Sequence, residues 1–176
     1  FEGTYRKGER SEVTIGGVDY RQGQIRERIA LLEQEPPLRY DLTVEETLRH
    51  SARIALDAKE YRDSAEGRLE KFCELFGLRG RRQSRIKTLS GGEMRRVALA
   101  AELMGSPGLI ILDEPLSGLD PYNSRILWSH LKQLAFLGHT LILPTHSYEA
   151  LRIANTVLVI HPGEQCFYGS PQGAYQ

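Results

Sequence analysis

Short apolar runs separated by helical stretches dominate the second half of the chain. From residue 89 onward the order is a glycine turn, a helix, and then apolar strands at residues 109–112, 140–143 and 156–160, with helices between them. Apolar strands that alternate with helices are typical of a parallel sheet covered by helices. Gly163 then turns the chain into a last short strand at residues 165–168. We therefore expect an α/β fold.

The first half of the chain predicts β structure followed by helices. Over residues 11–34, Val13 and Ile15 alternate with polar neighbours, Gly16 and Gly17 form a turn, and residues 29–32 are apolar. Thr43 and Glu46 have the spacing of a capping box, which begins a helix that extends to about residue 56. Apolar residues then recur at helical spacing until Gly77; they are Leu69, Phe72, Cys73 and Phe76. We predict a small β hairpin followed by a helical subdomain.

Two adjacent carboxylates end the apolar strand at residues 109–112. Asp113 and Glu114 would emerge at the carboxyl edge of a parallel sheet, where open α/β folds bind ligands. An aspartate there can bind Mg²⁺, and a neighbouring glutamate can orient or deprotonate an attacking water. The alternative is an acidic turn without a chemical role, because apolar strands often end in Asp.

A glycine turn precedes the helix that follows residue 90. Ser90, Gly91 and Gly92 let the backbone approach a ligand, and the positive end of the following helix favours a phosphate. The same residues, with Glu93, also suit an ordinary loop and N-cap. The pattern alone favours a loop and N-cap over an anion site.

Composition limits the partners that the chain can attract by charge. The 23 basic residues balance 23 acidic ones, so no global attraction to nucleic acid or an anionic membrane is expected. The arginine-rich segment at residues 79–85 lacks interleaved aromatic residues, and we expect a solvated loop there. No apolar run approaches the roughly 20 residues that span a bilayer. Cys73 and Cys166 lie far apart, which favours free thiols over a zinc site.

Taken together, the motifs resemble those of ABC ATPases. Five of them have the family's order and spacing, and the resemblance covers most of the chain from about residue 11 to 168. They are Gln34 ahead of residues 43–46 (Q-loop), Leu89 to Glu93 (signature motif), Leu109 to Glu114 (Walker B strand), Ser117 to Asp120 (D-loop) and His146 (switch histidine). Residues 101–103 and 163–171 look closest to subfamily G transporters.

The resemblance implies a role for each matching residue. Glu114, His146 and Gln34 would be catalytic, with Asp113 and Gln34 contacting Mg²⁺. Ser90, Gly91, Gly92 and Glu93 would contact ATP held by a second nucleotide-binding domain, and Asp120 would link the two sites of the dimer. Asp120 also precedes Pro121, so a plain N-cap role fits as well. The implied location is the cytoplasmic face of a membrane, where the helical region contacts the transmembrane domain of a transporter.

The resemblance also divides the chain and shows one departure from the family. The implied segments are 1–42 (β segment and Q-loop), 43–88 (helical subdomain) and 89–176 (the remaining ATPase motifs). The phosphate-binding Walker A loop, GxxxxGKS/T, has no match, and its place would be before residue 11. Without it we expect the chain alone to be inactive, and the loss of a central strand to leave two strands with unpaired edges. Pro144 is a second departure, which should end its strand early without moving His146 far.

Two other functions remain open at this stage. One is an ABC ATPase without a membrane partner that acts on ribosomes or DNA, although a neutral chain without a basic stripe argues against binding nucleic acid. The other is a non-catalytic regulatory remnant. We therefore expect ATP and Mg²⁺ as ligands of the intact site, and no nucleic-acid partner.

Overall fold

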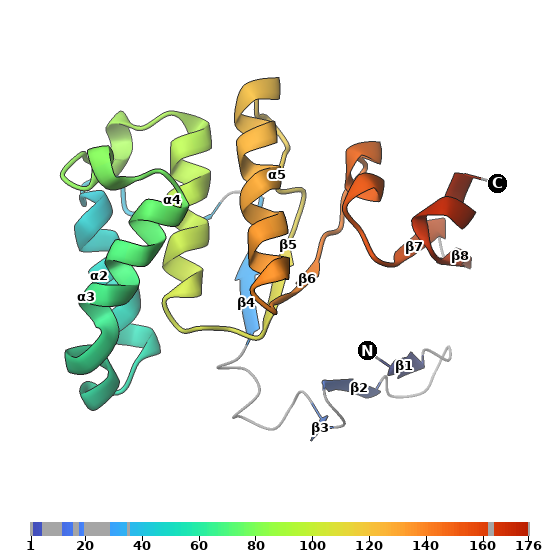
Figure 1. The fold of residues 1–176 in the computed structure, drawn as a ribbon, viewed down its shortest axis with the longest axis horizontal. Coiled ribbons are helices and arrows are strands. Elements are labelled where there is room, and N and C mark those ends of the chain that lie inside the picture. The colour runs from blue at the N-terminus through green and yellow to red at the C-terminus, as the bar shows by residue number, and fades with distance from the viewer. Residues whose placement is uncertain are drawn as a thin grey trace.

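The computed structural model describes residues 2–4, 12–15, 18–19, 29–34, 36–161 and 164–175. Strands come first and helices follow them, and strands and helical segments alternate from residue 91 to residue 161 (Figure 1). The helices are α2 (Val44–Ala55), α3 (Ala58–Leu75), α4 (Gly91–Leu103) and α5 (Pro121–Phe136), with 3-10 turns η1 (Arg79–Arg81), η2 (Ile86–Thr88), η3 (Tyr148–Arg152) and η4 (Pro171–Tyr175). The strands are β1 (Glu2–Thr4), β2 (Glu12–Ile15), β3 (Val18–Asp19), β4 (Ile29–Leu32), β5 (Leu109–Leu112), β6 (Thr140–Ile142), β7 (Val157–His161) and β8 (Glu164–Gly169).

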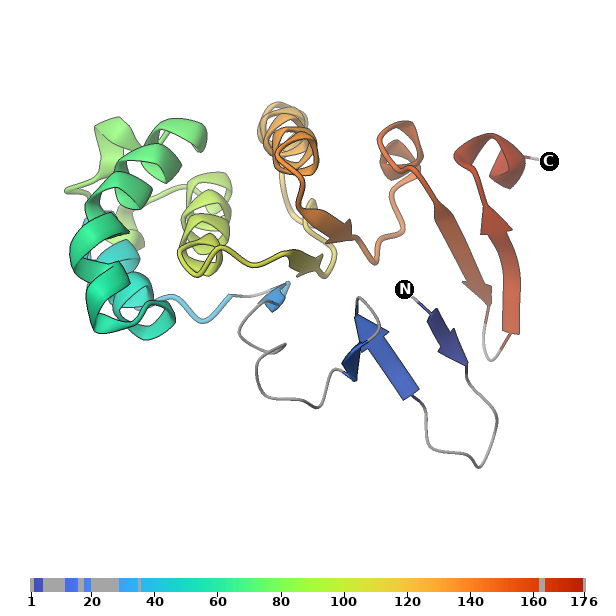
Figure 2. The same ribbon diagram turned by 60° about the horizontal axis from the view of Figure 1, so that its bottom comes forward.

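A parallel sheet with the order β4-β5-β6 positions the candidate residues. Ile29 pairs with Leu109, and Leu109 pairs with Thr140, so the three strands start level with one another. Figure 2 shows α4 and α5 on one side of this sheet. Because the strands are parallel, the segments that follow β4, β5 and β6 all leave from the same edge. The predicted α/β fold with a helix-covered parallel sheet is confirmed.

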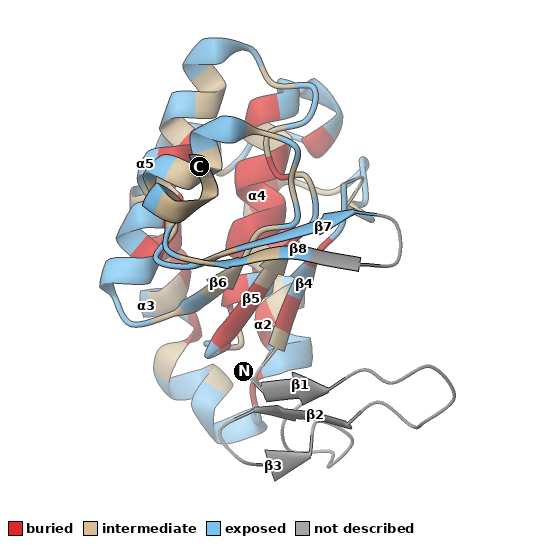
Figure 3. Cartoon of the chain, turned by 90° about the vertical axis from the view of Figure 1, so that its right-hand side faces the viewer, coloured by how far each residue is buried: buried red, intermediate tan, exposed pale blue. Residues whose placement is uncertain are grey.

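Strand β7 does not join this sheet, contrary to the expectation from its apolar sequence. It pairs antiparallel with β8, and among the described strands β6 pairs only with β5. Most of β7 is exposed (pale blue in Figure 3). An apolar run predicts a strand but does not specify its neighbours. Each of β4, β6, β7 and β8 thus has one edge without a described partner, and the expectation that two of these edges flank a missing central strand stays a prediction.

The N-terminal strands form an antiparallel sheet with the order β1-β2-β3. Thr14 of β2 pairs with Glu2 on one side and with Asp19 on the other. This confirms the predicted β hairpin. The turn at Gly16 and Gly17 and most of residues 20–28 lie outside the described residues, as does Gly163 in the β7-β8 turn.

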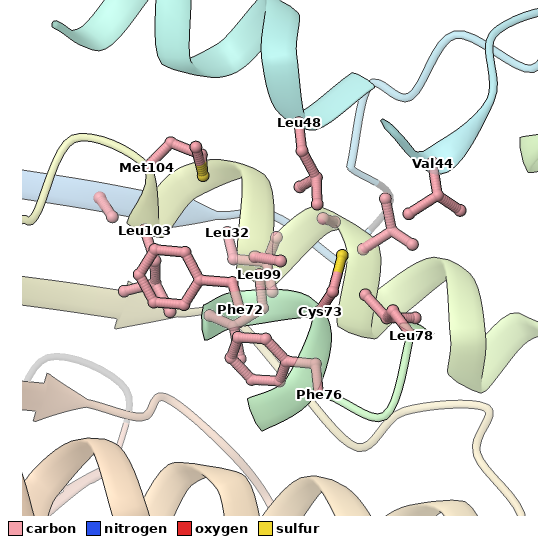
Figure 4. Close-up of a cluster of buried hydrophobic side chains, with 14 of the residues drawn as sticks. Leu32, Val44, Leu48, Phe72, Cys73, Phe76, Leu78, Leu99, Leu103 and Met104 are labelled. Carbon is pink, nitrogen blue, oxygen red and sulfur yellow. The ribbon is translucent and has the colours of Figure 1, made fainter. Parts of the chain in front are cut away.

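Helices α2, α3 and α4 share one hydrophobic core with β4 and β5. The residues of the predicted apolar stripe, Phe72 and Cys73 among them, point into the centre of this core together with Leu48 and Leu99 (Figure 4). The cluster includes residues from all three predicted segments of the chain. The boundaries at residues 42 and 88 therefore remain predictions.

The arginine-rich segment is mostly exposed, as expected for a solvated loop, but it also makes contacts that we did not expect. It contains the turn η1, and three of its arginines form ion pairs with carboxylates on three helices. Arg82 binds Glu45 of α2 at 3.1 Å and Glu70 of α3 at 2.9 Å, while Arg81 binds Glu93 of α4 at 2.8 Å. The expectation considered only neighbours along the chain, whereas the fold brings acidic side chains of three helices to this segment.

Candidate functional site

The two carboxylates after β5 lie between the ends of the neighbouring strands. The backbone N–H of Asp113 donates to the carbonyl of Leu32 (2.9 Å), and that of Glu114 donates to the carbonyl of Pro144 (3.0 Å). Glu114 has a φ of 41°, a left-handed conformation that is costly for a residue with a side chain. The hydrogen bonds to both flanking segments hold this conformation and direct the Glu114 side chain towards the end of β6.

The Glu114 carboxylate is held by the segment that follows β6. Its Oε2 accepts from the Thr145 hydroxyl (3.0 Å), and its Oε1 accepts from the backbone N–H of His146 (2.9 Å). The His146 Nε2 lies 3.6 Å from Glu114 Oε1, and the imidazole is fully exposed. Glu114 and His146 thus lie together on the same edge of the sheet. Asp113 is exposed beside them.

Sequence reasoning missed Thr145 as part of this site. Strand β6 ends at Ile142, two residues before Pro144, as expected from the proline. The Pro144 carbonyl then accepts from the backbone of Glu114, which brings the next residue within reach of the carboxylate. The only available signal was the position of a hydroxyl residue directly before His146.

The Ser90 turn (Ser90–Gly92) begins helix α4 with a complete capping box. Ser90 Oγ accepts from the Glu93 N–H (3.2 Å), and Glu93 Oε2 accepts from the Ser90 N–H (2.8 Å). Burial would raise the pKa of Glu93, but the hydrogen bonds from Ser90 and Arg81 outweigh it and lower the pKa. Ser90 and Gly91 are exposed while Gly92 is buried. The N-cap interpretation is therefore correct, and it leaves the turn accessible to a ligand.

Gln34 lies close to the loop that follows Glu114. Its Nε2 donates to the Ser117 hydroxyl (3.1 Å), so the amide oxygen remains available as a ligand. The Asp113 carboxylate makes no hydrogen bond or ion pair with any described residue. Among those residues no cluster of three or more metal-binding side chains occurs. Mg²⁺ takes one or two protein oxygens together with substrate phosphates and water, and Asp113 with Gln34 fits such a donor set.

Asp120 acts as the N-cap of α5. Its Oδ1 accepts from the backbone N–H groups of Tyr122 (2.9 Å) and Asn123 (3.0 Å), and its Oδ2 accepts from the Asn123 amide (2.5 Å). The hydrogen bonds from the Asn123 side chain and backbone lower the pKa of Asp120. This confirms the capping role, whereas a role of Asp120 between two copies of the domain stays a prediction.

Comparison with known proteins places the chain in a family. The family model described as ABC transporter matches residues 2–117. ABC transporter ATP-binding/permease protein Rv1747 of Mycobacterium tuberculosis is 34% identical over 148 residues, which cover 84% of this chain and 17% of that protein. Nod factor export ATP-binding protein I of Cupriavidus metallidurans is 35% identical over 156 residues, covering 88% of this chain and 50% of that protein.

A plant relative is similar to a comparable degree. ABC transporter G family member 26 of Arabidopsis thaliana is 31% identical over 167 residues, which cover 91% of this chain and 24% of that protein. The chain thus spans half or less of the length of these three relatives. Since relatives of several kinds match about equally well, the assignment to subfamily G stays a prediction. None of the helices in the described part of the chain has the length and apolarity needed to cross a bilayer.

Proposed function

The chain belongs to the ABC transporter family, and we propose that it forms part of the ATP-hydrolysing domain that drives transport in a larger assembly. The observation that carries this proposal is the Glu114 carboxylate, fixed by Thr145 and by the backbone of His146, with the imidazole 3.6 Å away. A carboxylate in a fixed orientation at the carboxyl edge of a parallel sheet suits a general base for an attacking water.

The geometry supports a separate role for each of these residues during hydrolysis. A water attacks the γ-phosphorus of ATP and gives a proton to Glu114, while the bond between the γ-phosphorus and the bridging oxygen breaks to release ADP. The exposed His146 imidazole would contact the γ-phosphate and help to hold the transition-state geometry. Bound Mg²⁺, held through Asp113 and Gln34, would neutralise phosphate charge.

The Ser90 turn would act on a nucleotide held by a second domain. It is exposed at the N-terminus of a 13-residue helix, where backbone N–H groups and the helix dipole favour a phosphate. No GxxxxGKS/T motif occurs in this chain, so the chain alone is expected to be inactive. Its Ser90 turn would complete the ATP site of a partner domain that carries this motif, in a homodimer or a heterodimer.

A groove beside Gln34 supports contact with a transmembrane domain. A cavity of 270 Å³ lies between the segment after β4 and helices α2 and α4. Its lining combines apolar side chains, such as Leu38 and the exposed Ile54, with His50 and Glu102. Protein interfaces combine an apolar core with a polar rim, and the lining of this cavity contains groups of both kinds. We therefore place the domain at the cytoplasmic face of a membrane, with this groove towards the transmembrane partner.

The first prediction tests Glu114 directly. A protein is prepared in which a segment with GxxxxGKS/T from a related domain precedes residue 1, and Mg-dependent phosphate release is measured. We expect ATP hydrolysis, and a loss on the order of 100-fold or more with Glu114→Gln, because the amide cannot accept the proton of the attacking water.

The matched control is Glu60→Gln, which makes the same chemical change at an exposed position on α3. It should hydrolyse ATP at the unmodified rate. Equal activity of Glu114→Gln and Glu60→Gln would overturn the assignment of the base. A lack of hydrolysis in the unsubstituted protein, despite bound ATP, would overturn the proposed function itself.

A further inference from the structure

The 117–120 loop, between β5 and α5, is held by side chains from three other parts of the fold. Gln34 donates to the Ser117 hydroxyl at 3.1 Å. Arg95 of α4 donates to the Ser117 carbonyl at 3.3 Å. At the other end of the loop, Asn123 in the first turn of α5 donates to the Asp120 carboxylate. The loop is therefore connected to the segment after β4, to α4 and to α5.

The carboxamide group of Asn123 donates one hydrogen bond and accepts another. Its Nδ2 donates to Asp120 Oδ2 (2.5 Å), and its Oδ1 accepts from Arg96 Nη1 (3.1 Å). An amide can donate and accept at the same time, whereas a carboxylate only accepts and an aliphatic side chain does neither. The Asn123 side chain thus links a residue of α4 to the 117–120 loop.

Arg96 depends on this link. Only 9% of its surface is exposed, and burial lowers the pKa of its guanidinium. Within the described part of the chain no carboxylate forms an ion pair with Arg96, and its Nε has no hydrogen-bond partner there. The hydrogen bond to Asn123 Oδ1 is therefore a main source of compensation for a buried charge.

Gly92 is in direct contact with the same carboxamide. A Cβ atom at this position would lie 2.5 Å from Asn123 Oδ1 and 2.6 Å from its Cγ, distances shorter than any van der Waals contact. The backbone of Gly92 does not need the conformational freedom of glycine, since its φ is not positive. The second glycine of the Ser90 turn therefore also makes room for Asn123.

We propose that Asn123 is a positioning residue that fastens the Ser90 turn and the 117–120 loop into one unit. This inference rests on the proposed function, in which the Ser90 turn contacts nucleotide. Movement of the turn on contact with nucleotide would then be passed to Asp120 through Gly92 and Asn123, and through α4 and Arg95 to Ser117. Asn123 itself would touch neither ATP nor the attacking water.

The isosteric change Asn123→Asp separates positioning from simple packing. An aspartate keeps the shape beside Gly92 and still accepts from Arg96, but it places a second carboxylate against Asp120. We expect amide hydrogen exchange of residues 117–120 in this chain to become about tenfold faster, with α4 unchanged. In the double variant Asn123→Asp with Asp120→Asn, the amide at position 120 can donate to the carboxylate at position 123. This restores a hydrogen bond between the two side chains and should restore slow exchange.

The kinetic test uses the protein with the added GxxxxGKS/T segment. Asn123→Asp should lower kcat on the order of tenfold, because the loop that contacts Gln34 is displaced, and should change the KM for ATP less than about twofold. Ser124→Ala, at the next position of α5, is the control and should keep the original kcat. A merely structural role predicts unchanged exchange and kcat in Asn123→Asp, since its packing is preserved.

Two outcomes of the exchange measurements would overturn the proposal: unaltered exchange in Asn123→Asp, or exchange that stays fast after the double change. These measurements need no nucleotide, so they decide the role of Asn123 even if the unsubstituted protein fails to hydrolyse ATP. Such a failure would count against the proposed function alone. Unchanged kcat together with faster exchange would show that the link is not used in catalysis and would also overturn the proposal.

Discussion

At the scale of single residues, the orientation of Glu114 depends on one hydroxyl group. Thr145 donates to one carboxylate oxygen, while the other accepts from the His146 backbone N–H, which every substitution except proline leaves in place. We predict that Thr145→Val lowers kcat of the protein with the added GxxxxGKS/T segment about tenfold, whereas Thr145→Ser retains most of it. The rate of phosphate release at saturating ATP gives kcat for both variants. Equal rates for the two variants would show that the hydroxyl is not needed.

A half-buried histidine makes stability depend on pH. His130 of α5 packs edge-on against Phe76, with ring centroids 5.1 Å apart, and its Nδ1 is buried without a described partner. Burial, with a smaller effect of Arg96, lowers the pKa of His130 from 6.5 to about 4. Below pH 6.5 the unfolded chain therefore takes up a proton that the folded chain does not. Stability is then lost as the pH falls from 6.5 towards 4.

The size of this effect can be measured by denaturation. Between pH 7 and pH 5 the unfolding free energy of the natural protein should fall by about 2 kcal/mol more than that of His130→Leu, which has no titrating group here. Urea unfolding at the two pH values gives this difference. If the unfolding free energy of both proteins falls by the same amount, the pKa of His130 is not lowered in the folded protein.

At the scale of elements, hydrogen bonds within a few residues fix the helix starts. The Thr43 hydroxyl accepts from the Glu46 N–H at 3.1 Å, and the Glu46 carboxylate accepts from the Thr43 N–H at 2.8 Å. Thr43→Ala should lower the unfolding free energy by about 1 kcal/mol. The control Ser129→Ala removes an exposed hydroxyl from the interior of α5 and should change it by less than about 0.5 kcal/mol. Chemical denaturation measures the unfolding free energy of both variants.

At the scale of the whole molecule, open strand edges should promote self-association. Strands β6 and β7 each have an edge without a described partner, and Leu158, Val159 and Ile160 of β7 are 51%, 42% and 68% exposed. Exposed apolar edges pair readily with other chains. We predict association that increases with concentration and is reduced by Ile160→Lys, as measured by sedimentation velocity.

Phe136→Lys provides the matched control for this prediction. It replaces another exposed apolar residue, at the end of α5 and away from β7, so association should persist. A chain that stays monomeric at high concentration and melts cooperatively at high temperature would contradict the prediction.

The sequence predicted the features that depend on residues close together along the chain. The capping box at Thr43, the N-cap at Ser90 and the strand that ends in Asp113 and Glu114 were all predicted, because each depends on residues no more than about four positions apart. The convergence of Glu114 and His146 was also expected, since consecutive parallel strands end at one edge.

The tertiary structure alone decided which distant groups meet. It paired β7 with β8, placed three arginines of residues 79–85 against carboxylates of three helices, and brought Asn123 over Gly92. The apolar pattern of a segment indicates that the segment is buried or extended. The same pattern suits many different packing partners, so it does not identify the neighbour. By itself the sequence therefore determined the elements and the chemistry at their ends, while the packing of separate elements decided the contacts that hold this chemistry in place.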